Sequence, residues 1–103
     1  MELINLTPHK IKEVETGAVF PVSGLVARVD FETRKAGNIG DIALYKRAYG
    51  QPVGIPKSQA GVIYIVSNMV LNALNGSRKD VVAPGELIRN SEGNPTGCIG
   101  FVC

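Results

Sequence analysis

The stretch GVIYIVSNMVLNAL, residues 61–74, changes its apolar period in the middle. Residues 62–66 form a continuous run of β-branched and aromatic side chains, which is typical of a buried strand. From Ser67 onward the apolar residues recur at helical spacing. The stretch therefore predicts a strand that runs directly into a short helix, over about 67–75. Ser67 is the expected N-cap residue, and Gly76 is the expected stop signal.

The rest of the chain alternates between extended segments and turns. Extended segments are predicted at ELINL (2–6), IKEV (11–14), LVARVDFE (25–32), DIALYKRAYG (41–50), ELIRN (86–90) and TGCIGFV (96–102). We expect 25–32 and 41–50 to form a hairpin across the turn-rich TRKAGNIG (33–40), and 86–90 and 96–102 to form a closing hairpin. The predicted class is α+β and β-rich: a mainly antiparallel sheet or partly open barrel with one short helix.

Size and charge narrow the classes of function. A chain of 103 residues with 45% hydrophobic content suits one domain over 1–103. The net charge of +2 comes from residues of mixed sign, without the basic stripe that long nucleic acids require. No apolar run has the length of a signal peptide or a membrane span. We therefore expect a soluble, cytoplasmic protein with no membrane partner and no long nucleic-acid partner.

Metal and cofactor chemistry is not expected from the sequence. Cys98 and Cys103 would face opposite sides of one strand, so a disulfide between them is not predicted. With His9 as the single histidine, the chain has too few soft ligands for a zinc site. Cys98 is interpreted as a small core residue rather than a nucleophile.

Several side chains remain as candidates for ligand contact, although no convincing catalytic set emerges. They are Thr7, His9, Arg28, Tyr45, Arg47, Ser67, Asn68 and Arg78. His9 is either a hydrogen-bond donor or general base at a rigid corner, or a loop histidine bonded to a carbonyl. Ser67 either caps the helix alone or shares the free N–H groups with a phosphate. Arg78 either grips a phosphate or anchors its loop through Asp80.

The remaining candidates also have structural alternatives. Arg28 either contacts the ligand or forms a surface ion pair. Arg47, between Tyr45 and Tyr49, either helps to stack a base or belongs to a cross-strand ladder. Asn68 begins a stripe of asparagines that faces either water or a ligand.

Several motifs recur together in a family that this chain resembles. They are NLTPHKI, FPVSGLVARV, YGQPVGIP, GVIYIVSNMV, RKDVVAP and GCIGF. Together they cover nearly the whole chain, which resembles a family of small, mostly uncharacterised proteins of bacteriophages and prophages. The resemblance implies a phage setting, in which small β-rich proteins without catalytic machinery include sponges that sequester nucleotide signals of bacterial immunity, such as cyclic nucleotides or ADP-ribose derivatives.

The leading hypothesis is therefore a phage-encoded binding protein that holds a nucleotide-derived signal without cleaving it. One alternative is a small hydrolase or lyase with His9 as acid or base, and another is a phage structural or interaction protein. A chain this small cannot easily enclose a nucleotide. We therefore expect a homo-oligomer, a dimer or higher, with the ligand near the interface.

Overall fold

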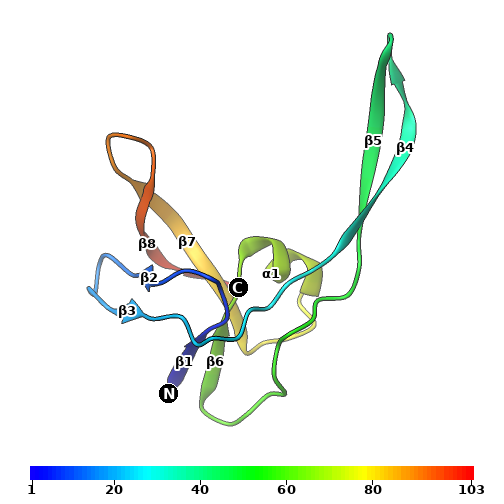
Figure 1. Ribbon diagram of the computed structural model, residues 1–103. Helices are drawn as coiled ribbons and strands as arrows, with labels where there is room; N and C mark the ends of the chain where they lie inside the picture. The colour runs from blue at the N-terminus through cyan, green and yellow to red at the C-terminus, as the bar shows by residue number, and fades with distance from the viewer.

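The computed structural model describes residues 1–103 as a curled sheet, two hairpins and one helix (Figure 1). The elements are β1 (Glu2–Asn5), β2 (Ile11–Lys12), β3 (Val19–Phe20), β4 (Phe31–Ile39), β5 (Ile42–Tyr49), β6 (Val62–Ile65), α1 (Asn68–Leu74), β7 (Val81–Arg89) and β8 (Pro95–Val102). The β-rich class with one short helix is confirmed. The hairpins are antiparallel, and two further strand pairs are parallel, β1 with β6 and β6 with β7.

The central sheet has the strand order β1-β6-β7-β8. Tyr64, Ile65 and Val66 are all 1% exposed or less, so the second half of β6 and the residue after it are buried on both faces. A strand covered on both sides must be apolar at consecutive positions, because neither face meets water. This explains why the sequence runs without alternation up to Ser67.

Helix α1 begins at the predicted cap, and its left-handed C-cap is Asn75, one residue before the predicted stop signal Gly76. The Ser67 side chain accepts from the Val70 backbone N–H at 3.3 Å, and the helix stops at Asn75, which adopts a left-handed conformation with φ of 51°. Val70 is buried in the main core, whose members are Leu6, Ala27, Val29, Tyr64, Val66, Val70 and Val81. With seven residues, α1 is too short to span a bilayer, and the chain has no helix longer than this one.

The β2–β3 hairpin links the two outer strands of the sheet into a partly open barrel. On one side, Glu13 bridges to Cys98 of β8, and the Val14 N–H donates to the Cys98 carbonyl at 2.9 Å. On the other side, Val22 bridges to Asn5 at the end of β1. The hairpin therefore brings β2 alongside β8, from which it is far apart in sequence.

One predicted strand is displaced. Residues 25–32 were expected to be a strand, but β4 starts only at Phe31 and runs through the segment expected to be a turn. The turn is the short Gly40–Asp41 connection between Ile39 and Ile42, with φ of 61° at Gly40. A two-residue turn with positive φ closes a hairpin with a shorter loop, and so a smaller loss of entropy, than the eight-residue turn predicted at 33–40. The strand therefore continues up to Ile39. The alternation predicted in 25–32 still marks burial, since Ala27 and Val29 are buried and Arg28 is exposed.

The β4–β5 hairpin projects from the body as an arm (Figure 1), and every residue from Phe31 to Tyr49 is exposed. The Cα radius of gyration is 16.3 Å. A compact chain of this length has a radius of gyration of about 13 Å. The projecting arm accounts for this extended shape, with principal extents of 51 × 39 × 22 Å.

Candidate functional site

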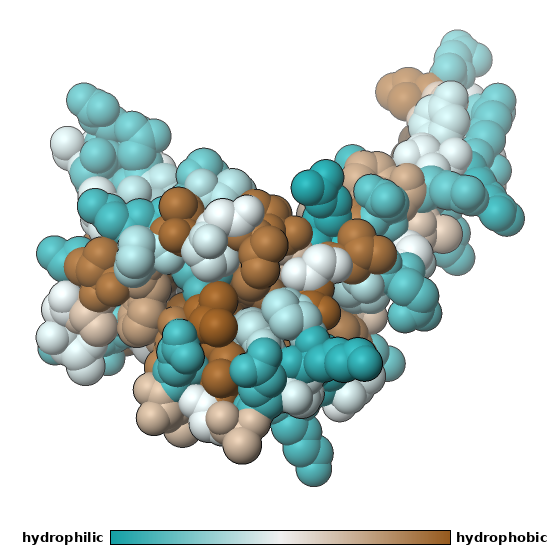
Figure 2. All heavy atoms as spheres, turned by 60° about the horizontal axis from the view of Figure 1, so that its bottom comes forward, coloured by the Kyte–Doolittle hydropathy of each residue, from teal (hydrophilic) through white to brown (hydrophobic).

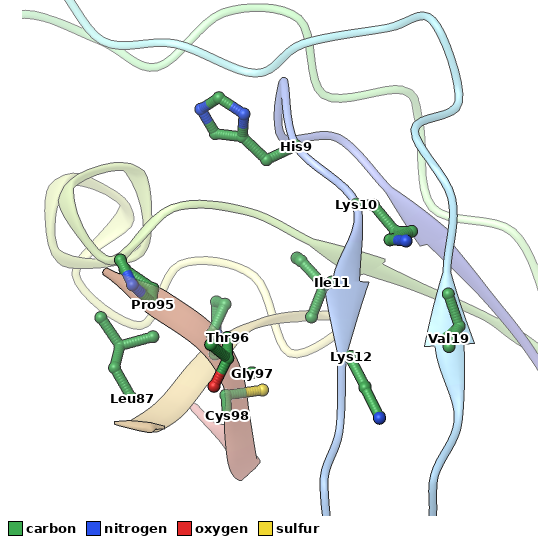
Figure 3. A pocket seen from close by; sticks show the side chains of 11 residues that line it. His9, Lys10, Ile11, Lys12, Val19, Leu87, Pro95, Thr96, Gly97 and Cys98 are labelled. Atoms are coloured by element: carbon green, nitrogen blue, oxygen red, sulfur yellow. The ribbon is translucent and has the colours of Figure 1, made fainter. Parts of the chain in front are cut away.

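A groove lies between the β2–β3 hairpin and the β7–β8 hairpin (Figure 3). Its volume is about 550 Å³. The lining residues are His9, Lys10, Ile11, Lys12, Val19, Pro84, Leu87, Pro95, Thr96, Gly97 and Cys98. The groove thus depends on the closure of the barrel, because its two walls come from opposite ends of the chain.

A buried hydrogen-bonded corner positions His9 at the end of this groove. The Asn5 side-chain amide donates to the His9 carbonyl at 2.8 Å and to the Phe20 carbonyl at 3.0 Å. The Thr7 hydroxyl lies 2.7 Å from Asn5 Oδ1 and 2.9 Å from the His9 carbonyl oxygen. Pro8 fixes its own φ between them. Thr7, predicted as a ligand contact, is 8% exposed, and its hydroxyl is engaged in holding this corner.

Glu13 fixes the wall formed by β2 against β8. Its carboxylate accepts from the backbone N–H groups of Thr16 at 2.8 Å and Gly100 at 2.9 Å, and from the Thr16 hydroxyl at 2.7 Å. These hydrogen bonds, with the one from Gly100 first, lower the pKa of Glu13 to about 2. The ionised carboxylate therefore joins the β2 turn to β8 at neutral pH.

The groove combines an apolar floor with basic groups. Ile11 projects toward the β8 wall and His9 lies at the upper end of the groove, whereas the side chains of Lys10 and Lys12, on either side of Ile11, lie toward β3 (Figure 3). Neither lysine forms a salt bridge, because the two salt bridges of the chain join Arg34 to Glu32 and Arg78 to Asp80. The ammonium groups of both lysines are thus free of carboxylate partners.

Cys98 lies at the bottom of the groove as a buried thiol. Cys98 is only 1% exposed. Burial raises the pKa of this thiol, and the nearby Glu13 carboxylate raises it further. Cys98 is therefore protonated at neutral pH and packs as a small apolar side chain. No cluster of three or more His, Cys, Asp or Glu side chains that could hold a metal ion is present.

Ser67, Asn68 and Arg78 lie outside the groove. The Ser67 hydroxyl is the helix cap, and the Asn68 side-chain amide donates to the Pro84 carbonyl at 3.4 Å. Arg78 binds Asp80 in a bidentate pair, at 2.8 Å from Nε and 2.7 Å from Nη2, and also donates to the Pro56 carbonyl at 3.0 Å. Of the two roles considered for Arg78, the structure shows the loop anchor through Asp80, and Arg78 is not among the residues that line the groove.

Arg28, Tyr45 and Arg47 lie on or near the arm and do not line the groove either. Arg28 is exposed and does not form the surface ion pair that was one of its alternatives; its backbone pairs with Val53. The Arg47 guanidinium carbon lies 4.8 Å from the centroid of the Phe31 ring, so its aromatic partner is Phe31 rather than either neighbouring tyrosine. Among the eight predicted contacts, only His9 lines the groove.

Sequence reasoning missed Lys10, Lys12 and Thr96. A weak signal was present, because two lysines flank Ile11 immediately after the TPH corner. The β8 wall carried no comparable signal, since neither Thr96 nor Gly97 has a charged or titratable side chain. Comparison with protein-family models, curated proteins and solved structures found no match to this chain.

Proposed function

We propose that the chain binds a small nucleotide-derived anion in the β2–β8 groove and holds it without cleaving it. The observation that carries this proposal is the groove itself, a concave site that combines apolar side chains with two lysines that form no salt bridge. Pockets for small molecules typically have volumes of about 300–1,000 Å³ and few polar groups. The groove, at about 550 Å³, is within that range.

The lining suits the two halves of a nucleotide. Ile11, Leu87 and Pro95 offer apolar contact to a planar base or a ribose face. Lys10 and Lys12 carry charges that attract a phosphate or pyrophosphate, and His9 adds a hydrogen-bonding ring at the upper end. Because the lysines have no carboxylate partners, a phosphate would not have to displace an existing ion pair.

The same lining favours retention over cleavage. None of the lining residues is a carboxylate, so His9 has no acidic partner within the groove for acid–base catalysis. The raised pKa of Cys98 disfavours the nucleophilic thiolate. The resemblance to small phage proteins supports the biological setting: a phage-encoded protein that withholds a cyclic nucleotide or ADP-ribose derivative from host immunity.

Thermal-shift measurements with ADP-ribose, a cyclic dinucleotide and AMP test this proposal. A ligand that binds only the folded chain raises Tm by mass action. The Lys10→Glu/Lys12→Glu variant should lose at least tenfold in affinity for the probe that binds. The matched control is Lys79→Glu, which reverses an exposed lysine outside the groove and should keep the parent's affinity.

The fate of the probe separates binding from chemistry. After incubation and heat release, mass spectrometry should recover the probe intact. A cleaved probe would favour the hydrolase alternative with His9 as acid or base. If no probe raises Tm, or if the double lysine variant binds as well as the parent, the groove assignment is wrong.

A further inference from the structure

The surface of the chain is larger than a monomer of this mass should have. The accessible surface is 7266 Å² for a mass of 11.0 kDa. A folded monomer of that mass exposes about 5,600 Å². The excess of roughly 1,600 Å² per chain is in the range that each subunit of an obligate homodimer buries. The isolated chain therefore has enough uncovered surface for an extensive interface.

Much of this uncovered surface is on the β4–β5 arm. A two-stranded hairpin is marginally stable in water when neither face is covered, yet all residues of the arm are exposed. Ile39 and Ile42 are directly paired at its end, and Leu44 follows on the same side. These three residues, the arm tip, are 64%, 71% and 43% exposed. Figure 2 shows the arm clear of the body, with an apolar side chain near its end.

An apolar hollow lies at the other end of the arm. It has a volume of about 400 Å³ and is lined by Tyr49, Met69, Asn72 and Ala73, where the base of β5 meets α1. The nine residues of β4 separate tip and base by about 30 Å. The arm tip therefore cannot fill the hollow of its own chain.

We propose that the arm tip of one chain docks into the base hollow of a second copy, and that the reciprocal contact closes a twofold dimer. Each chain offers one projecting apolar tip and one apolar hollow, so a second copy covers both features at once. A lipid surface is a poorer occupant, because Asp41 lies in the turn between Ile39 and Ile42. This interface does not depend on what the β2–β8 groove binds.

Sedimentation velocity at micromolar concentrations tests the assembly. The parent should sediment with twice the 11.0 kDa mass of one chain. Ile42→Asp, at the most exposed position of the tip, should sediment as a single chain. Val22→Asp is the matched control, since Val22 is 51% exposed and lies outside both tip and hollow; it should remain a dimer.

A disulfide tests the contact directly. In a Cys103→Ser background, Ile39→Cys combined with Met69→Cys should give a disulfide between chains on mild oxidation, whereas either cysteine alone should not give this product. A monomeric parent, or an Ile42→Asp variant that keeps the parent's mass, would overturn the proposal. Failure of the paired cysteines to link chains would equally overturn docking in the base hollow.

Discussion

Glu13 is the residue that most directly joins the two walls of the groove. It is 6% exposed, and its carboxylate accepts hydrogen bonds from its own turn and from Gly100 of β8. In the unfolded chain its pKa returns toward the ordinary value of 4.5, whereas in the folded chain the pKa is about 2. Between those values the unfolded state binds more protons than the folded state, so acid favours unfolding.

We therefore predict that the free energy of unfolding contributed by Glu13 is fully present above about pH 4.5 and is lost as the pH falls toward 2. Glu13→Gln should lower the urea midpoint at pH 7 and weaken the loss of stability between pH 5 and pH 3. The control is Glu15→Gln, because Glu15 is exposed. Equal pH profiles for the parent and Glu13→Gln would refute this role.

At the level of single residues, the sequence predicted local roles better than distant ones. The Ser67 cap is confirmed because its partner, Val70, is three residues away on the same helix. Asn5 and Glu13 were not identified as organising residues, because their partners Phe20 and Gly100 become neighbours only when the barrel closes. A buried amide or carboxylate cannot be recognised before its donors and acceptors are known.

At the level of elements, the backbones of β7 and β8 approach each other closely at Gly85. The flanking residues Pro84 and Glu86 pair with Phe101 and Ile99. A Cβ atom at Gly85 would overlap the backbone carbonyl oxygen of Ile99. Because that oxygen is part of the main chain, it cannot move aside without shifting β8.

We predict that Gly85→Ala destabilises the fold by about 1–3 kcal/mol through this overlap. The control is Gly50→Ala, whose Cβ would lie 3.5 Å from the Asp30 carbonyl oxygen, an ordinary contact, and whose φ is not left-handed. The control should change stability by less than about 0.5 kcal/mol. Guanidinium denaturation of both variants measures the difference, and equal stabilities would contradict the close approach of the strands.

The elements that were predicted correctly are those with strong local signals. β6 and α1 follow from a change of period at a capping residue, and the pairing of β7 with β8 follows from the turn residues between them. The start of β7 was not predicted, because the strand begins at Val81 rather than at Glu86. The second strand of the β4–β5 hairpin was predicted at its observed place, but the first strand was predicted too early, because TRKAGNIG is rich in turn formers. The Gly40–Asp41 turn decides which residues pair with β5. Composition alone does not distinguish a long twisted ribbon from a loop.

At the scale of the whole molecule, the groove is a product of chain closure. Its walls, near residues 9–12 and 95–98, are separated by most of the sequence and are joined by the contacts of Glu13 and Val14 with β8. The sequence could suggest His9 as a contact, but it could not show that His9 faces β8. For the same reason, the predicted grouping of His9 with Ser67 and Arg78 did not follow from any local pattern.

The measurement that tests the central claim most directly is a two-dimensional amide NMR titration of the full chain with ADP-ribose and a cyclic dinucleotide. If the proposed site is right, a binding probe changes the amide chemical shifts of His9, Ile11, Thr96 and Gly97. The amide chemical shifts of α1 and of the arm tip stay unchanged. Amide shifts confined to α1 and the Arg78 loop, or no shifts with either probe, would contradict the claim that this groove holds a nucleotide-derived anion.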